Sequence, residues 1–185
     1  MTLFVTRIPS PVGPLVLVKS ARGLVRLQFE DRELPIDPAW RRDAGAFRDE
    51  SAQLAEYFAG ERDRFDLALD ARGTPFQTRV WTALRAIPFG TTSTYGAVAR
   101  AIGSPTASRA VGAANGQNPI AIVVPCHRVI GASGALTGFA GGLPRKRALL
   151  DHEARHFRRY TLMMGTPSCV STKSGASVPN AIHSS

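Results

Sequence analysis

The N-terminal third of the chain begins with three short apolar runs of the kind that form β-strands. They cover residues 3–8, 13–20 and 23–29. In the last run apolar side chains alternate with Arg26 and Gln28, which is the pattern of a strand with one buried face. Residues 21–23 (Ala-Arg-Gly) predict a hairpin turn between the second and third runs. The pattern therefore predicts a small sheet.

A helix is predicted after these strands. One face of it would carry four apolar side chains, Phe47, Leu54, Tyr57 and Phe58. Gly60 stands where a C-cap is expected, and residues 64–70 favour one more strand. Because residues 1–70 contain neither Cys nor His, a metal site of soft ligands is excluded there. We expect this part of the chain to be a structural α+β domain.

From Thr74 onward the spacing of apolar residues becomes helical. Thr74 is a candidate N-cap and Pro75 suits the first position of a helix. One face of this helix would carry Phe76, Val80, Leu84 and Ile87. Residues 88–90 (Pro-Phe-Gly) then predict its end.

Two shorter helices are predicted next. Thr94 can cap a helix over residues 95–102, which Gly103 ends, and Ser104-Pro105 would begin a helix that stops at Gly116. Two helices joined by a glycine-containing turn are typical of a helix-turn-helix DNA-binding unit. Two packed core helices would give the same pattern.

The second of these short helices is rich in small residues. They are Ala107, Ala110, Gly112, Ala113, Ala114 and Gly116. Arg109 is its one long basic side chain. Small side chains permit a close approach to another molecule but bond to few base edges. A single arginine among them suits insertion into a base stack, whereas close packing between helices is the alternative, and the sequence leaves both open.

The distribution of charge favours a polyanionic partner. The chain has 23 Lys and Arg against 14 Asp and Glu, a net charge of +9. No Asp or Glu occurs from Ala71 to Leu150, and only Asp151 and Glu153 follow. A segment without carboxylates gains from phosphate contacts through counterion release. Most of the basic residues are arginines, which suit bidentate phosphate contacts. A basic domain with no such partner is the alternative.

The overall composition is that of a globular protein, with 44% hydrophobic and 20% charged residues. No apolar run reaches the roughly 18 residues of a membrane helix, and the N-terminus lacks a secretory signal pattern. Cys126 and Cys169 are the only cysteines, which argues against a disulfide scaffold. We therefore expect a cytoplasmic protein without a membrane partner.

The strongest chemical signal is the run Val124-Pro125-Cys126-His127-Arg128-Val129. Residues 119–125 are almost wholly apolar and predict a buried strand that ends at Cys126. A thiol reacts as its thiolate, and a neighbouring imidazole is a usual means of removing the proton. A loop of small residues follows and would leave the thiol at the mouth of a pocket. A buried structural cysteine is the alternative.

Glu153 is the candidate to orient His127, because it is one of only two carboxylates in the second part of the chain. Cys126, His127 and Glu153 would also suit a cysteine hydrolase, but no oxyanion loop is recognisable. A zinc site made of His152, His156 and Cys126 would lack a convincing fourth ligand. Three basic residues nearby, Arg145, Lys146 and Arg147, would contact phosphate or lie in solvent.

The segment "NPIAIVVPCHRVIG" followed by "GALTGFAGGLPRKRALLDHE" resembles the active-site region of the O6-alkylguanine-DNA alkyltransferases. The resemblance extends back through "TPFQTRVWTALRAIPFGTTSTYGAVARAIGSPTASRAVGAANGQ" and is looser in the first third. It implies an α+β fold, in which a small sheet-plus-helix domain (1–70) precedes a mainly helical, winged-helix-like domain (71–156) with a helix-turn-helix. We expect residues 157–185 to be a disordered tail in which Cys169 has no role.

The resemblance also implies roles for residues around the thiol. Cys126 would accept the alkyl group and would be activated by His127 and Glu153. Tyr95 would donate a hydrogen bond toward the guanine ring as the alkyl group leaves. Asn118 would brace the turn between the second short helix, which would be the recognition helix, and Cys126.

Other positions of the family motif would contact the substrate. Arg109 would fill the gap left by a flipped nucleotide. Further DNA contacts would come from Thr94, Ala110, Gly112, Ala113 and Arg128. The guanine pocket would be lined by Val129, Phe139, Ala140 and Gly141. The backbone amide of Ala140 would bond to the guanine. Many family members have tyrosine in place of Phe139, so stacking is kept here and a hydroxyl contact is lost.

The function that follows from the resemblance is repair of O6-alkylguanine, chiefly O6-methylguanine, in double-stranded DNA. A flipped nucleotide would transfer its alkyl group to Cys126, without a cofactor or a metal, in a protein expected to be a monomer. Because water does not readily cleave a thioether, each molecule would act once. A non-enzymatic lesion-binding protein is the alternative, although such relatives replace the cysteine.

Overall fold

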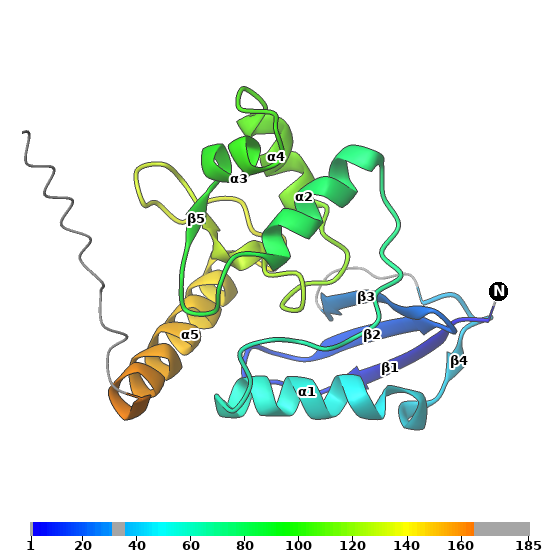
Figure 1. Ribbon diagram of the computed structural model, residues 1–185. Coiled ribbons are helices and arrows are strands. Elements are labelled where there is room, and N and C mark those ends of the chain that lie inside the picture. Colours follow the sequence, from blue (N-terminus) through cyan, green and yellow to red (C-terminus); the bar gives the residue numbers. More distant parts are fainter. Residues whose placement is uncertain (1, 31–35, 165–185) are drawn as a thin grey trace, which may run out of the picture.

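The computed structural model describes residues 2–30 and 36–164, and it has an α+β fold with two parts (Figure 1). The first part is a four-stranded sheet in the order β3-β2-β1-β4. Its strands are β1 (Phe4–Ile8), β2 (Leu15–Ser20), β3 (Gly23–Phe29) and β4 (Arg41–Arg42). The three predicted strands and the hairpin between β2 and β3 are confirmed. The short β4, which pairs parallel to β1, was not predicted.

One helix packs along this sheet. A single 3-10 turn, η1 (Ala44–Phe47), leads into α1 (Arg48–Ala59), which ends at Gly60 in the left-handed conformation as predicted. The strand predicted at residues 64–70 is wrong. Only Leu69 forms a bridge there, to Leu24 of β3. The backbone of Leu24 bonds to Ala68 and Asp70, on either side of Leu69, and these two hydrogen bonds are too few to form a strand.

The second part of the chain is mainly helical. Its helices are α2 (Pro75–Arg85), α3 (Tyr95–Ala101), α4 (Ser108–Gly116) and α5 (Leu143–Met164). The N-cap predicted at Thr74 is confirmed and forms a capping box with Gln77. Helix α4 begins at Ser108 and not at Pro105, because residues 104–107 form a separate turn. Helix α5 continues past His156, so the expected start of the tail lies inside a helix. Residues 165–185 lie outside the described residues.

The strand predicted at residues 119–125 is wrong in an informative way. Ile120 alone pairs with Leu27 of β3, and the chain then folds back on itself. The backbone N–H groups of Val123, Val124 and Cys126 donate to carbonyls two to four residues earlier, so no neighbouring strand is needed to satisfy them. Ile122 has a φ of 71°, which is unusual for a β-branched residue. Cys126 therefore enters a one-turn 3-10 helix, η2 (Cys126–Arg128), from a buried turn.

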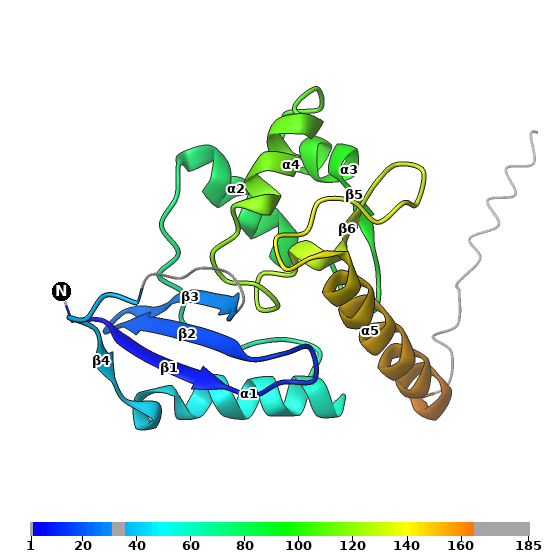
Figure 2. The same cartoon turned by 180° about the vertical axis from the view of Figure 1, so that it is seen from behind.

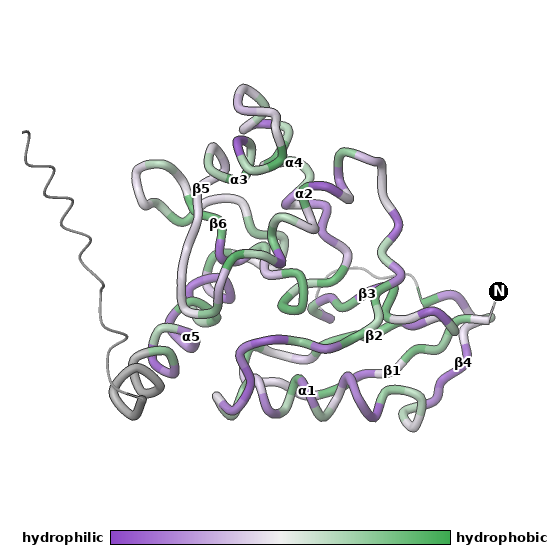
Figure 3. Tube along the Cα trace, viewed as in Figure 1, coloured by the Kyte–Doolittle hydropathy of each residue, from purple (hydrophilic) through white to green (hydrophobic). Residues whose placement is uncertain are grey.

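A single apolar core joins the two parts of the molecule. It includes Leu17 and Leu27 from the sheet, Leu84 from α2 and Ile122 from the turn before Cys126. Figure 3 shows these segments as hydrophobic stretches of the trace that face one another. The view from behind shows the turn between the sheet and α5 (Figure 2). Within residues 2–30 and 36–164, no helix has the length and apolar character needed to cross a membrane.

Candidate active site

Cys126 lies buried at the start of η2, and its surroundings keep the thiol protonated at rest. Its side chain has no disulfide partner, and the Asn118 Nδ2 lies 3.1 Å from Sγ. Burial raises the pKa of the Cys126 thiol, while the Asn118 amide and the Lys146 ammonium group lower it only in part. Cys126 is thus a thiol, and Asn118 and Lys146 are in place to stabilise the thiolate that it would form.

Asn118 holds the turn that carries the thiol. Its Nδ2 also donates to the Val124 carbonyl at 2.7 Å, and its Oδ1 accepts from the Ile120 N–H at 3.0 Å. One buried side chain therefore connects both ends of the turn and the sulfur. The structure places Asn118 where the sequence analysis expected a brace.

His127 and Glu153 form a buried pair behind the thiol. The His127 Nε2 lies 2.8 Å from Glu153 Oε1, and neither side chain is exposed. Burial lowers the pKa of His127, even though Glu153 favours the charged imidazolium. Since the carboxylate accepts, Nε2 carries the proton and Nδ1 is left as an acceptor. Among the described residues, that buried Nδ1 has no hydrogen-bond partner.

Glu153 stays ionised because several donors surround it. Arg128 Nε donates to Oε2 at 2.9 Å and Nη2 donates to Oε1 at 2.9 Å. The Gly90 N–H and the Tyr57 hydroxyl donate at 3.0 and 2.8 Å. Burial alone would raise the pKa of Glu153, but hydrogen bonds and charges from His127 and Arg128 lower it to about 2. The carboxylate is therefore a fixed negative charge beside His127.

The position of Arg128 corrects a prediction. Its side chain is buried, pairs with Glu153 and donates from Nη1 to the Ile87 carbonyl at 2.6 Å. A guanidinium group held in this way cannot also bind DNA phosphate, so the predicted DNA contact of Arg128 is wrong. Its role is to neutralise the buried carboxylate.

Lys146 is also buried, although the sequence analysis expected it at phosphate or in solvent. Its ammonium group donates to the Val129 carbonyl at 2.5 Å and to the Thr137 carbonyl at 2.6 Å. Burial lowers the pKa of Lys146. The side chain ties helix α5 to β6 (Val129–Ile130), a short strand that pairs parallel with β5 (Ser93–Thr94). It also ties α5 to the loop over residues 135–142, which we call the pocket loop.

The pocket loop closes the space beside the sulfur. The cavity there measures about 10 Å³ and is lined by Cys126, Asn118, Phe29, Phe139, Ala140 and Gly141, among others. This is room for about one water molecule. Val129 does not line this cavity, but its carbonyl holds Lys146. The Tyr95 hydroxyl donates to the pocket-loop carbonyl of Thr137 at 3.1 Å. The cavity in this structure is thus too small to hold a base beside Cys126.

The helix-turn-helix residues lie on or near the surface of α3 and α4. Thr94 caps α3 by accepting from the Ala97 N–H. Arg109, Ala110 and Ala113 are exposed on α4, and a Cβ added at Gly112 would lie 3.8 Å from the Tyr95 ring. These positions form a small-residue surface with one projecting cation, next to the element that carries Tyr95.

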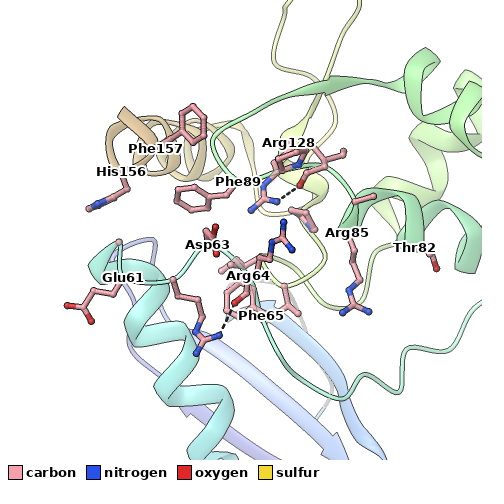
Figure 4. Close-up of a pocket in the computed structure, with 18 residues that line it drawn as sticks. Glu61, Asp63, Arg64, Phe65, Thr82, Arg85, Phe89, Arg128, His156 and Phe157 are labelled. Carbon is pink, nitrogen blue, oxygen red and sulfur yellow. Dashed lines mark hydrogen bonds between the residues drawn. The ribbon is translucent and has the colours of Figure 1, made fainter. Parts of the chain in front are cut away.

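A larger cleft of about 740 Å³ does not open on the thiol (Figure 4). It lies between the end of α1, the end of α2 and α5, and Phe65, Phe89 and Phe157 line it. Arg128 forms part of its inner wall, with the hydrogen bond to the Ile87 carbonyl drawn as a dashed line. This larger cleft is thus behind the Glu153 cluster, and the cavity beside the thiol is the smaller of the two.

Sequence reasoning missed two residues of the site. Tyr57 was identified only as part of a helix face, yet it contacts Glu153 across 96 positions of sequence. Asn115 lines the thiol cavity, and its buried Oδ1 has no hydrogen-bond partner among the described residues. A polar residue inside an otherwise small and apolar helix was the available signal for Asn115. In the described part of the chain, no three His, Cys, Asp or Glu side chains are placed to share a metal ion.

The helix-turn-helix surface and the buried Cys126, His127 and Glu153 together define the class of the protein: a DNA-binding protein with a buried cysteine site beside its DNA-binding helices. Two family models match the chain: the 6-O-methylguanine DNA methyltransferase ribonuclease-like domain over residues 3–71, and the DNA binding domain of the same family over residues 75–155. Together they span most of the described residues. The chain therefore belongs to the O6-methylguanine-DNA methyltransferase family, whose enzymes repair DNA by alkyl transfer.

Curated relatives agree with the family models. The chain is 56% identical over 147 residues to a methylated-DNA–protein-cysteine methyltransferase of Mycobacterium bovis, covering 79% of this chain and 89% of the relative. It is 51% identical over 146 residues to the Methanosarcina acetivorans enzyme of the same name, covering 78% and 94%.

Solved structures match in fold as well as in sequence. The O6-methylguanine methyltransferase of Mycobacterium tuberculosis has a TM-score of 0.78 and 52% identity, with 84% of this chain and 94% of that chain covered. The Mycobacterium tuberculosis OGT in complex with DNA has a TM-score of 0.77 with the same identity and coverage.

Proposed function

We propose that Cys126 is the residue that accepts the alkyl group from O6-alkylguanine in double-stranded DNA. The observation that carries this proposal is the buried arrangement of Cys126, His127 and Glu153 next to the helix-turn-helix. A thiol, an imidazole with a free acceptor nitrogen and a fixed carboxylate are the groups that an in-line transfer to sulfur requires.

The proton and the alkyl group move in opposite directions in this reaction. The Cys126 proton passes to Nδ1 of His127, directly or through one water, and Glu153 stabilises the resulting imidazolium. The sulfur attacks the alkyl carbon, so that an S–C bond forms while the C–O6 bond breaks. The electrons of the broken bond stay on the guanine, which takes up a proton as it leaves. Tyr95 supports this step by donating a hydrogen bond toward the ring.

The base must leave the duplex before this can happen. A flipped nucleotide costs a few kcal/mol of stacking and pairing, which an inserted side chain offsets in part. Arg109, which is exposed on α4, supplies the inserted side chain in this proposal, and the small residues of α4 let the DNA backbone come close. Tyr95 must also turn from the Thr137 carbonyl to the base, so opening of the pocket loop and engagement of the substrate are coupled.

The reaction consumes the protein. A thioether is stable to water, and among the described residues no group near Cys126 is suited to remove the alkyl group. We infer that each monomer repairs a single lesion, in the cytoplasm, where a cysteine-poor chain with a reactive thiol stays reduced.

The proposal is tested with a duplex that carries a single O6-methylguanine. With protein in excess, conversion to guanine is followed by chromatography of the digested nucleosides. We expect Cys126→Ser to abolish conversion, because a hydroxyl is a far weaker nucleophile than a thiolate. Cys169→Ser, the matched control, keeps full activity. Conversion by a folded Cys126→Ser protein would overturn the assignment.

A further inference from the structure

Tyr57 is a buried tyrosine whose hydroxyl reaches the active site from the N-terminal part of the chain. Its ring lies on α1 and packs against Phe58, Phe65, Phe89 and His152, with centroid separations of 5.1 to 6.0 Å. No part of the residue is exposed. Packing of this kind needs only a phenyl ring, so the hydroxyl requires a separate explanation.

The residue is held to α5 at two points. The backbone carbonyl of Tyr57 lies 2.8 Å from Nε2 of His152, and its hydroxyl lies 2.8 Å from Oε1 of Glu153. Figures 1 and 2 both show the C-terminal end of α1 beside α5. Because the ring is enclosed and the main chain is fixed, the hydroxyl has one direction in which it can donate.

The oxygen that Tyr57 contacts is the one that faces His127. Oε1 of Glu153 receives hydrogen bonds from Tyr57, from His127 Nε2 and from Arg128, whereas Oε2 receives Arg128 and the Gly90 N–H. Three elements therefore determine how the carboxylate is rotated. Tyr57 is the contribution of the N-terminal part.

We propose that Tyr57 is a positioning residue for alkyl transfer, whose hydroxyl holds Oε1 of Glu153 toward His127 so that His127 can take the Cys126 proton. This inference rests on the proposed role of Cys126. It gives the N-terminal domain a part in the chemistry, in addition to its structural role. Tyr57 acts through Glu153 and does not touch the substrate.

The test compares single-turnover transfer to wild type and to Tyr57→Phe between pH 7 and pH 10, with the free base O6-benzylguanine as the probe. Phenylalanine keeps the four ring contacts and removes only the donor. At pH 7 we expect transfer to be about tenfold slower, which is a typical effect of one hydrogen bond to a charged group. As the pH rises, hydroxide in the solvent removes the thiol proton and the help of His127 is no longer needed. The ratio of the wild-type rate to the Tyr57→Phe rate should then narrow to less than about threefold.

Other groups that titrate in this range affect both proteins equally. Lys146 faces Cys126 in both proteins, and burial lowers its pKa in both, so it does not alter their ratio. The matched control is Phe58→Leu, which weakens packing on the Tyr57 ring and leaves the hydroxyl in place. Its ratio to wild type should not change with pH.

Two results would overturn the inference: equal rates for Tyr57→Phe and wild type at pH 7, or a deficit that is constant from pH 7 to pH 10. Denaturant unfolding of each variant confirms that the folded protein is measured. If wild type itself does not become alkylated at Cys126, the proposed function fails. If wild type is alkylated and Tyr57→Phe matches it, only the role of Tyr57 fails.

Discussion

Glu153→Gln provides a quantitative test of the buried charge cluster. The substitution keeps the shape of the side chain but removes the charge that Arg128 and His127 face. The new amide NH2 group would also face the N–H groups of Arg128 or Gly90, and two donors cannot form a hydrogen bond with each other. The buried guanidinium of Arg128 is then left without its counter-ion, which is the costly way to break a buried ion pair.

The expected cost is a few kcal/mol. Removal of one partner from a buried pair typically costs about 3–5 kcal/mol. The pKa of Glu153 moves from an ordinary value of 4.5 to about 2 in the folded protein. That difference, at about 1.4 kcal/mol for each pH unit, corresponds to about 3 kcal/mol of stability at neutral pH. Against a total of about 5–15 kcal/mol for a typical domain, this is a large loss.

The same pKa predicts how the loss depends on pH. Because the folded-state pKa is lowered, the contribution is complete above pH 4.5 and is lost as the pH falls toward 2. Denaturant unfolding, followed by fluorescence of the buried Trp81, should show Glu153→Gln about 3 kcal/mol less stable than wild type at pH 7. The deficit should be much smaller at pH 3.

The matched control is Glu56→Gln, which removes a carboxylate paired with Arg62 on the surface. We expect it to change stability by less than about 1 kcal/mol, as is usual for exposed ion pairs. A deficit for Glu153→Gln below 1 kcal/mol at pH 7, or one that is equal at pH 3 and pH 7, would refute the reasoning.

Two further variants test the DNA surface and a backbone position. Arg109→Ala should slow transfer from duplex DNA more than about tenfold and leave transfer from the free modified base unchanged, in parallel single-turnover assays; equal losses on both substrates would exclude insertion into the duplex. Gly60→Ala should lower the unfolding temperature more than Gly103→Ala does. Both glycines have a φ above 70°, but only at Gly60 would a Cβ meet the His156 ring, at 1.9 Å. Equal shifts would contradict this contact.

Local signals in the sequence were sufficient for much of the fold. The strands near Leu17 and Leu27 follow from alternation of apolar residues, and the start of α2 follows from Thr74 and Pro75. Each of these signals lies within a few residues of the structure that it predicts. The pairing of His127 with Glu153 was also predictable, because carboxylates are scarce in this part of the chain.

Contacts between distant residues account for the predictions that failed. The family resemblance led us to expect Arg128 at DNA, and nothing in the sequence near Arg128 indicates that it pairs with Glu153, which was assigned to His127. Residues 119–125 have the composition of a strand, but the Asn118 side chain forms hydrogen bonds with their backbone that a neighbouring strand would otherwise supply. Tyr57 looked like an ordinary core residue, since nothing in its local sequence indicates a partner on α5.

The most direct test of the account is the mass of the protein after reaction with an excess of O6-methylguanine duplex. We predict the addition of one methyl group per molecule, located by peptide mapping on Cys126, after which no further lesion is repaired. Methyl groups found on another residue, or many lesions repaired by each molecule, would contradict the central claim.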